Sequence, residues 1–586
     1  MKRIIYFLST IALFTLAGCQ KLDREITTDL NEQQIESIFA NVKSLLAGVY
    51  SETQEGFLNI DGAMMASATD EAEHTDGLSA VQNFNNGSWN AINNPDDVWG
   101  GFFRGIRKAN VFLLSTDSIN FDRFKLDPSV SSQLVYTRQL AEVTNWKYEA
   151  RFLRAFLYFE LVKRYGGVPI MTSPLGLDVI PTIKRNTLQE CIQFISNECD
   201  SAATNLPASY NELGTNATEL GRATKGAALA LKARLLLYAA SDLFNNPSWA
   251  SGFAQPLLIS LPAGDRAARW KAAADAAKAV IDLPGTGYAL FNNYGTLFRS
   301  FNNTEIIFTR RNTGTSSFEA ANLPVGYGGE SGTTPSQDLV DAYEIKASAT
   351  SSIKFDWNNP AHASNPYATT GAIARDPRLF MSILVNNVAF SVPGIVRLPA
   401  PVVSEIYTGG RDGKPLPKAS NTGYYLRKYV NETINRTIGQ TAVHSWIFFR
   451  LAEVYLNYAE ALNEFSPGNV DIKINYDRVR NRPGVLMPLL PAGLSQAEVR
   501  ERIRNERRVE LAFEDHRAWD VRRWMIAPAT LGGQLRGVDI TRTTATTFTY
   551  VPNVVETRVF LPQMYLYPIP QNELNISQGL VQNPLW

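Results

Sequence analysis

The segment IRNERRVELAFEDHRAWDVRRW (residues 503–524) constrains the interpretation of this chain more than any other. Between Glu501 and Trp524 there are seven arginines and six acidic residues, interleaved with large apolar and aromatic side chains. The planar guanidinium of arginine suits partly buried pairs with carboxylates, whereas a purely solvated helix face favours flexible lysines. The pattern predicts a structural network of ion pairs that ties this segment to its neighbours. A catalytic Glu/Arg site is the alternative, but a general acid or base is hard to poise among so many compensating charges.

A helix is predicted to begin just before this segment. Ser495 and Glu498 have the spacing of a capping box, in which each side chain satisfies a free backbone N–H of the other residue. Further along the same helix, Arg502 can pair with Glu506 four residues later. The segment should therefore open with a helix whose charged side chains lie at pairing distance.

The composition is that of a large globular protein. With 586 residues the chain can bury a sizeable core, and 45% apolar and 19% charged residues are ordinary values for folded domains. Basic and acidic residues balance at 56 each, which argues against nucleic acid as a partner. Three cysteines are too few for a disulfide scaffold. Cys191 and Cys199 fall about 12 Å apart along one predicted helix, too far to bridge, and are predicted to be core thiols.

Residues 1–19 have the order of a bacterial export signal. Two basic residues precede an apolar run at positions 4–16, which is too short to span a membrane. The run closes with Leu-Ala-Gly before Cys19, which resembles the lipobox of bacterial lipoproteins. The resemblance implies a lipidated Cys19 that anchors a body formed by residues 20–586. The alternative is an ordinary secretory signal with a chance cysteine.

Helical periodicity dominates two parts of the chain, residues 33–282 and 446–526. Apolar residues recur there at steps of three and four, and small residues face large ones as in tetratricopeptide-type hairpins. Thr187 and Glu190 form a second capping box. We therefore predict a mainly α fold, in which tetratricopeptide-like helical hairpins form a superhelical scaffold. The predicted helices cover residues 35–50, 99–113, 134–165, 187–206, 221–241, 270–281 and 446–464.

Residues 283–445 differ from these helical parts. They are rich in Gly, Pro, Asn, Ser and Thr, with only short apolar strings. This composition predicts an irregular, loop-rich ligand-binding region inserted on the scaffold, because long loops of this kind usually carry function. At the other end of the chain, residues 551–586 contain Pro568 and Pro570, which predict an extended tail lying on the body.

An acidic cluster follows the first predicted helix, and it includes Asp70, Glu71, Glu73, His74 and Asp76. These side chains could ligate a hard cation or act as a pair of carboxylates. The spacing is not that of an EF-hand, so we favour a solvated acidic loop. Contact between a ligand and the first two of these residues is the alternative.

Catalytic and metal-binding motifs are not evident in the sequence. The four histidines, at positions 74, 362, 444 and 516, lack the spacing of a zinc site. The glycine-rich run at 326–329 has no lysine after it, so it does not form a phosphate-binding loop. Neither a Gly-x-Ser-x-Gly elbow nor a catalytic Cys/His pair is present. We therefore expect no catalytic residue, no metal and no cofactor.

Aromatic residues in the loops are the leading candidates for ligand contact. Trp89, Tyr327 and Trp357 lie in Gly- and Asn-rich sequence and belong to no helical stripe, and Tyr367 and Tyr407 share this setting. A flat ring on a rigid surface can bind the apolar face of a sugar, while polar side chains pair with its hydroxyls. Ordinary packing of the loop is the alternative for each ring.

Four segments and the lipobox together resemble the SusD/RagB family of outer-membrane nutrient-binding lipoproteins. The segments are EARFLRAFLYFELVKRYGGVP (149–169), TGYYLRKY (422–429), the arginine-rich 503–524 and YLYPIPQNELNISQGLVQNPLW (565–586). The resemblance runs nearly end to end and leaves out only the individual loops.

This resemblance implies a function at the cell surface. A protein of this family is lipid-anchored in the outer membrane, faces outward and captures a nutrient, often a glycan oligomer and sometimes a peptide. It then acts as a lid over a TonB-dependent, SusC-like transporter. Two other classes stay open: a lipid-anchored helical-repeat scaffold that binds protein or peptide, and a glycan hydrolase, which needs a carboxylate pair or nucleophile that the sequence does not display.

Overall fold

The computed structural model describes residues 39–586, apart from 118, 120, 177–179, 211–218 and 399–401. The predicted signal peptide (residues 1–19) and its Cys19 lie outside the described residues, as does the start of the first predicted helix. Among the helices that are described, none combines the length and the apolar character of a membrane span.

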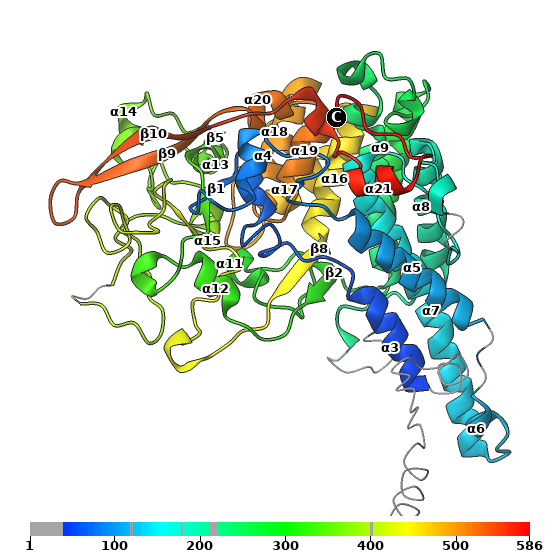
Figure 1. The fold of residues 1–586 in the computed structure, drawn as a ribbon. Coiled ribbons are helices and arrows are strands. Elements are labelled where there is room, and N and C mark those ends of the chain that lie inside the picture. Colours follow the sequence, from blue (N-terminus) through cyan, green and yellow to red (C-terminus); the bar gives the residue numbers. More distant parts are fainter. Residues whose placement is uncertain (1–38, 118, 120, 177–179, 211–218, 399–401) are drawn as a thin grey trace, which may run out of the picture.

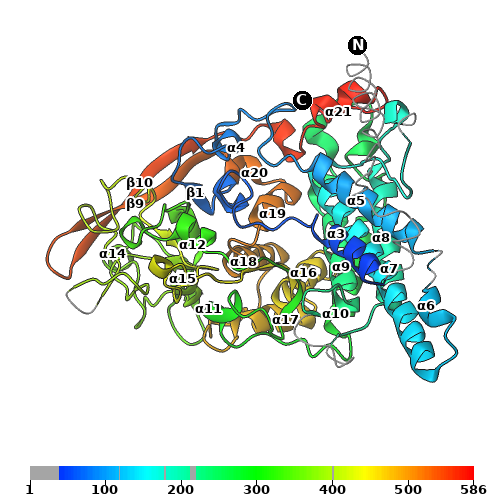
Figure 2. The same cartoon turned by 60° about the horizontal axis from the view of Figure 1, so that its bottom comes forward.

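Long helices occupy one side of the molecule and the loop-rich region the other (Figure 1). Successive helices pack as hairpins, α7 on α8, α8 on α9 and α9 on α10, and the series continues with α10 on α16 and α16 on α17 (Figure 2). This arrangement confirms the predicted mainly α class with tetratricopeptide-like hairpins. The scaffold helices are α3 (Phe39–Tyr50), α5 (Trp99–Ser115), α7 (Val130–Tyr165), α8 (Leu188–Asn205), α9 (Lys225–Ala240), α10 (Arg266–Ile281), α16 (Leu451–Phe465), α17 (Val470–Arg480), α18 (Gln496–Glu510) and α19 (Arg517–Arg523).

Local sequence signals explain where several helices begin and end. Both predicted capping boxes are confirmed, one at the start of α8 and one at the start of α18. Helix α7 ends at Gly166, whose φ of 75° favours glycine. Helix α9 is rich in alanine, and at Gly226 a side chain would collide with the Tyr288 ring, so the helix packs closely there. Cys191 and Cys199 on α8 are buried free thiols, as predicted.

Five antiparallel strand pairs complete the described part of the fold. The longest pair, β9 with β10, forms a hairpin that extends away from the body (Figure 1). The pairs are β1 (Ala72–His74) with β3 (Thr333–Pro335), β2 (Ile306–Arg311) with β8 (Ser445–Arg450), β4 (Ile345–Lys346) with β5 (Ser352–Ile353), β6 (Ile383–Leu384) with β7 (Tyr425–Leu426), and β9 (Gly533–Arg542) with β10 (Phe548–Arg558).

Short helices occur within the loop-rich region and outside it. Those within it are α11 (Tyr294–Leu297), α12 (Ser317–Asn322), α13 (Gln337–Ala342), α14 (Pro360–Ser364) and α15 (Arg378–Ser382). Those outside it are α4 (Gln82–Asn86), α6 (Asp122–Lys125), α20 (Ala527–Leu531) and α21 (Gln571–Ile576).

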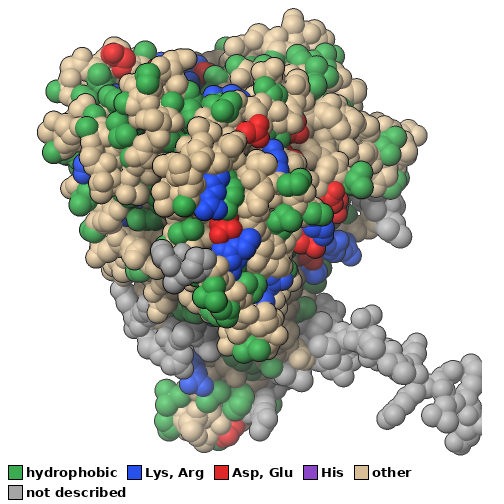
Figure 3. Space-filling view, turned by 90° about the vertical axis from the view of Figure 1, so that its left-hand side faces the viewer, with side chains coloured by type: hydrophobic (Ala, Val, Ile, Leu, Met, Phe, Trp, Pro, Cys, Tyr) green, Lys and Arg blue, Asp and Glu red, His purple; other side chains and the backbone are tan. Residues whose placement is uncertain are grey.

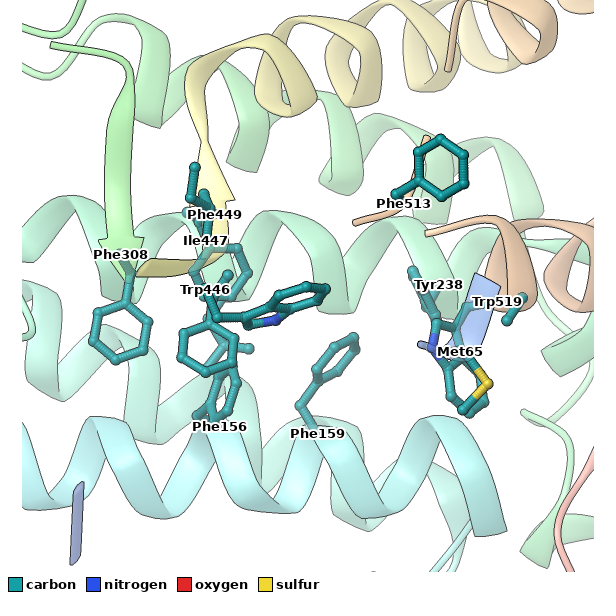
Figure 4. Close-up of a cluster of buried hydrophobic side chains, with 14 of the residues drawn as sticks. Met65, Phe156, Phe159, Tyr238, Phe308, Trp446, Ile447, Phe449, Phe513 and Trp519 are labelled. Atoms are coloured by element: carbon teal, nitrogen blue, oxygen red, sulfur yellow. The ribbon is translucent and has the colours of Figure 1, made fainter. Parts of the chain in front are cut away.

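An aromatic cluster joins the helical scaffold to the strand pair β2–β8. Phe156 and Phe159 of α7 lie near Phe308 of β2 and Trp446 of β8 (Figure 4). The Phe156 ring meets the Phe448 ring edge-on at 4.9 Å between centroids. Such edge-to-face pairs add about 0.5–1.5 kcal/mol beyond the burial of their area.

The prediction of a single helix over residues 446–464 is wrong at its start. Every residue of β8 is buried, and the strand pairs with β2 before α16 begins at Leu451. The run Trp-Ile-Phe-Phe is aromatic and β-branched, which fits a fully buried strand as well as a buried helix. Tertiary pairing decided between the two.

The prediction that Arg502 pairs with Glu506 is also wrong. Helix α18 stops at Glu510, and Phe513 and Asp515 then take positive φ values of 61° and 60° before α19 begins. Arg502 pairs with Glu344 at 2.7 Å and not with its helical neighbour. The ion pair of Arg502 therefore runs between elements and not along α18.

The C-terminal residues are less extended than predicted. Residues 551–558 belong to β10, and the six-residue helix α21 follows Pro570 directly. The part between them does lie on the body, where the Tyr567 ring meets Tyr165 at 5.9 Å and Trp519 at 5.8 Å.

Candidate functional site

A continuous network of buried ion pairs lies at the junction of α17, α18 and the loop-rich region, which confirms the network predicted from residues 503–524. Twelve ion pairs connect six cations with six anions, so the charges of the network cancel. The cations are Arg378, Lys428, Arg450, Arg480, Arg482 and Arg502, and the anions are Glu305, Glu344, Asp376, Glu506, Glu510 and Glu514.

Glu510 lies at the centre of this network. Its carboxylate accepts hydrogen bonds from Arg450 Nη1 and Arg482 Nη2, both at 2.7 Å, and from Arg378 Nη1 at 2.8 Å. Burial alone raises the pKa of Glu510, but the three arginines outweigh it and hold the pKa well below its ordinary value. Glu510 is fully buried and permanently charged, so its role is to hold elements together.

The predicted solvated acidic loop is wrong, because the segment around residues 70–74 is buried. Residues Ala72–His74 form β1 and pair with β3. The Asp70 carboxylate forms ion pairs with Arg508 at 2.7 Å and with Arg517 at 2.8 Å. Burial raises the pKa of Asp70, but these two arginines outweigh it and lower the pKa to about 2.

Glu71 is buried without an arginine of its own. Its Oε2 accepts a 3.4 Å hydrogen bond from the Phe513 backbone N–H, and its Oε1 has no partner among the described residues. Burial, and then the charge of Asp70, raise the pKa of Glu71 to about 8. The sequence suggested that Asp70 and Glu71 could contact a ligand from an exposed loop, but both carboxylates are buried. Asp70 nevertheless reaches the edge of a cleft.

Two of the three leading aromatic candidates are buried, so the prediction that these rings stand exposed in loops is wrong for both. Trp89 is 2% exposed and packs against Trp586 at 4.7 Å. Tyr327 is 1% exposed, with the Arg397 guanidinium 3.6 Å above its ring and its hydroxyl donating to the Phe390 carbonyl. The Gly- and Asn-rich loops fold back onto the core and carry these rings inward.

Trp357 keeps a partly exposed ring. Its Nε1 donates a 3.0 Å hydrogen bond to Asp341 Oδ1, and its ring meets the Phe355 ring edge-on at 5.0 Å. These contacts fix the orientation of the indole while part of its surface stays in solvent. Trp357 therefore remains a candidate for stacking.

Asp341 belongs to an open cleft between the β9–β10 hairpin, α13 and α18, which we name the hairpin cleft. Its volume is about 450 Å³. Phe355 also lines it, so the Phe355–Trp357 pair stands at its edge. The polar side chains that line it include Asp70, Asp338, Asp341, Lys354, Arg508 and Arg536.

Arg536 organises one wall of the hairpin cleft. Its guanidinium pairs with Asp338 at 2.7 Å and with Asp341 at 2.9 Å, and it remains partly exposed. Burial raises the pKa of Asp341, and Arg536 opposes this effect. Arg508 also lines the cleft, where its guanidinium pairs with Asp70 at 2.7 Å. The cleft thus offers both donors and acceptors, which suits a ligand rich in hydroxyl groups.

Sequence reasoning found two residues at or beside this cleft, Asp70 and Trp357, and missed the others. Asp338 and Asp341 lie on a six-residue helix, and Arg536 lies on a strand that the sequence did not indicate. Arg508 was assigned to the structural network with its neighbours. No local pattern marks these side chains, because they meet only after segments about 200 residues apart have packed together.

The outer face near the free end of the hairpin is polar and of mixed charge. In Figure 3 positive and negative side chains lie beside one another in the middle of this face. Ion pairs on this part of the molecule include Arg411 with Glu405 and Lys414 with Asp539. The face therefore lacks the single-sign field that would select a strongly charged ligand.

A scaffold of helical hairpins that carries a loop-rich region and a polar cleft defines the class of this protein. Residues 298–586 match the family model described as the SusD family, and residues 22–237 match one described as starch-binding, associating with the outer membrane. The chain belongs to the SusD/RagB family.

Relatives match over most of the chain. SusD-like protein P2 of Formosa agariphila is 25% identical and the match covers 98% of this chain and 97% of that protein; for SusD-like protein P25 the values are 24%, 83% and 78%. A SusD-like protein of Bacteroides fragilis is 26% identical, with a TM-score of 0.74 over 94% of this chain and 98% of that one. A SusD-like carbohydrate-binding protein of the same species is 25% identical, with a TM-score of 0.72 over 93% and 100%.

Proposed function

We propose that this protein is a lipid-anchored outer-membrane protein that captures an oligosaccharide and delivers it to a TonB-dependent, SusC-like transporter. The observation that carries the proposal is the similarity to SusD-family proteins along the whole chain, which includes a structure described as carbohydrate-binding. In this proposal Cys19 is lipidated and residues 20–586 form the body that faces outward.

The hairpin cleft is the proposed ligand site. Arg536 and Lys354 can donate hydrogen bonds to sugar hydroxyls, and Asp338 and Asp341 can accept them. Each hydrogen bond contributes only about 0.5–1.5 kcal/mol net, because the hydroxyl gives up water when it binds. Stacking on Trp357 must then supply much of the affinity, and an open site of this kind should bind moderately. Moderate binding suits a protein that has to release its ligand to a transporter.

Capture without cleavage is the proposed outcome at this site. Both carboxylates on the wall, Asp338 and Asp341, are held by the same guanidinium of Arg536. A glycosidase needs one carboxyl group as a proton donor and a second as a nucleophile or base across the scissile bond. Two carboxylates that share one cation on one wall do not form that arrangement, and the third carboxylate that lines the cleft, Asp70, is paired with Arg508 and Arg517.

The test is a glycan array followed by calorimetry on the best ligand, with chromatography of that ligand after overnight incubation. Trp357→Ala should weaken binding by about 2 kcal/mol, the range of an interface hot spot. Tyr407→Ala is the matched control, because this half-buried ring packs on Phe548, which does not line the cleft, whereas Trp357 contacts the lining residues Asp341 and Phe355. Equal binding by both variants would place the site elsewhere, and cleaved ligand would make the protein an enzyme.

The transporter is tested separately. Affinity capture of the lipidated protein from solubilised outer membrane should recover a large β-barrel protein. Repeated recovery of the chain alone would favour the free-standing scaffold that binds protein or peptide.

A further inference from the structure

Helix α7 extends well beyond the helices that flank it, and its free end carries the short helix α6 (Figures 1 and 2). Lys147 of α7 pairs with Asp117, just past the end of α5, at 2.8 Å. Val130 lies seventeen positions before Lys147, so the start of α7 projects past α5 by about 25 Å at 1.5 Å per residue. We name α6 and the first turns of α7 the α7 tip.

The α7 tip exposes aliphatic side chains to an unusual degree. Leu126 is 75% exposed, Val130 77% and Leu134 66%. Val130 and Leu134 stand one helical turn apart and so share a face, and Leu126 precedes them on the connecting turn. Figure 3 shows hydrophobic side chains on this lobe, at the bottom of the view. Most of the surface of each of these three aliphatic side chains is therefore open to solvent.

The chain enters the fold at the base of this tip. Phe39, the first described residue, packs its ring on Trp146 at 4.7 Å and on Phe121 at 5.9 Å. Trp146 is sixteen residues along α7 from Val130, so the base lies about 24 Å from the free end.

We propose that the α7 tip contacts the lipid bilayer in which the protein is anchored, with Leu126, Val130 and Leu134 entering the interface. The proposal rests on the proposed lipidation of Cys19. Nineteen residues lie between Cys19 and Phe39, and a chain of that length spans at most about 70 Å. The anchored end can therefore lie as far from the base as the free end of the α7 tip does.

The chemistry of the tip favours lipid over a protein partner. Its exposed apolar groups are aliphatic, whereas protein interfaces concentrate their binding energy in Trp, Tyr and Arg. Arg138, one helical turn after Leu134 on α7, is also exposed, and its long side chain can reach headgroup phosphates while its stem lies on apolar surface.

The test uses the full lipidated chain, reconstituted into phosphatidylcholine vesicles, with an environment-sensitive fluorophore on one introduced cysteine. Val130→Cys places the fluorophore on the tip, and Thr144→Cys places it at an exposed position nearer the base of the same helix. Cys191 and Cys199 are buried, so the label goes to the introduced thiol. We expect a blue shift and quenching by nitroxide-labelled lipid at residue 130 and neither at residue 144.

Each other result contradicts the proposal. Vesicles that float with the protein but leave the residue 130 emission unshifted would refute contact by the tip and leave the anchor standing. Failure to float, with no shift, would refute both. A shift at both positions would mean that the tip is not the contacting part. The Cys19→Ala variant without vesicles gives the last comparison: a blue shift there would show that the leader or a second copy covers the tip.

Discussion

Replacing Glu510 with alanine should destabilise the protein severely without touching the proposed ligand site. The carboxylate accepts three charge-assisted hydrogen bonds of 2.7–2.8 Å, from Arg450, Arg482 and Arg378, and is fully buried. Its loss leaves six cations, five of them buried, facing five anions. Breaking a buried ion pair by removing one partner costs about 3–5 kcal/mol, and domains are stable by only about 5–15 kcal/mol. We expect Glu510→Ala to remove a large part of the free energy of unfolding.

Urea denaturation followed by circular dichroism measures this loss, and Glu501→Ala is the matched control. Glu501 is on the same helix but its side chain is 70% exposed, and it meets Arg504 only at 3.5 Å. A surface pair of this kind is worth about 0–1 kcal/mol. Glycan binding by the folded fraction of Glu510→Ala should equal that of the wild type. The reasoning fails if the two variants are equally stable, or if Glu510→Ala keeps its stability and loses binding.

Three further predictions concern other parts of the molecule. Trp89→Ala should cost about 3–5 kcal/mol of stability, as for a buried aromatic, and leave the affinity of the folded protein unchanged, which titration calorimetry checks. The pKa of Glu71 is about 8 in the folded state against 4.5 as the ordinary value, so its contribution to stability is full below about pH 4.5 and lost as pH rises through about 8. Glu71→Gln should flatten this dependence, which is on the order of 4 kcal/mol, in melting curves at pH 5 and pH 8; an unchanged slope would contradict the assignment. Cys19→Ala should leave the protein unprocessed or free of membrane, and unchanged partitioning into detergent would refute the lipid anchor.

The helical scaffold could be predicted because its signals are local. Apolar residues at steps of three and four, together with the capping boxes at Thr187 and Ser495, define the helices of the scaffold from the sequence alone. The arginine-rich segment indicated buried ion pairs because arginines alternate there with large apolar side chains. These features depend on residues a few positions apart, so they can be recognised in the sequence without knowledge of the fold.

The partners in the network and in the hairpin cleft could not be predicted, because they meet from distant parts of the chain. Arg502 pairs with Glu344, 158 residues away in the sequence, although Glu506 lies only one helical turn from it on α18. Trp89 lies in a polar loop, yet it is buried by Trp586 at the end of the chain. The acidic cluster at 70–74 is polar enough for solvent, but two distant arginines and a strand partner bury it. Local polarity does not indicate burial where the compensating group comes from elsewhere.

One face of helix α18 belongs to the ion-pair network, and another face lines the hairpin cleft. Glu506 and Glu510 are four residues apart and face the network, whereas Asn505 and Arg508 are three apart and line the hairpin cleft. The network pairs on one face of α18 therefore fix the position of the cleft wall on another. Side chains at the edge of the cleft that take no part in the network, such as Lys354 beside Trp357, are free to differ between relatives without disturbing the fold. Exchanging such edge residues should therefore change which sugar is bound at little cost in stability, whereas a change in the network should alter stability for every ligand alike.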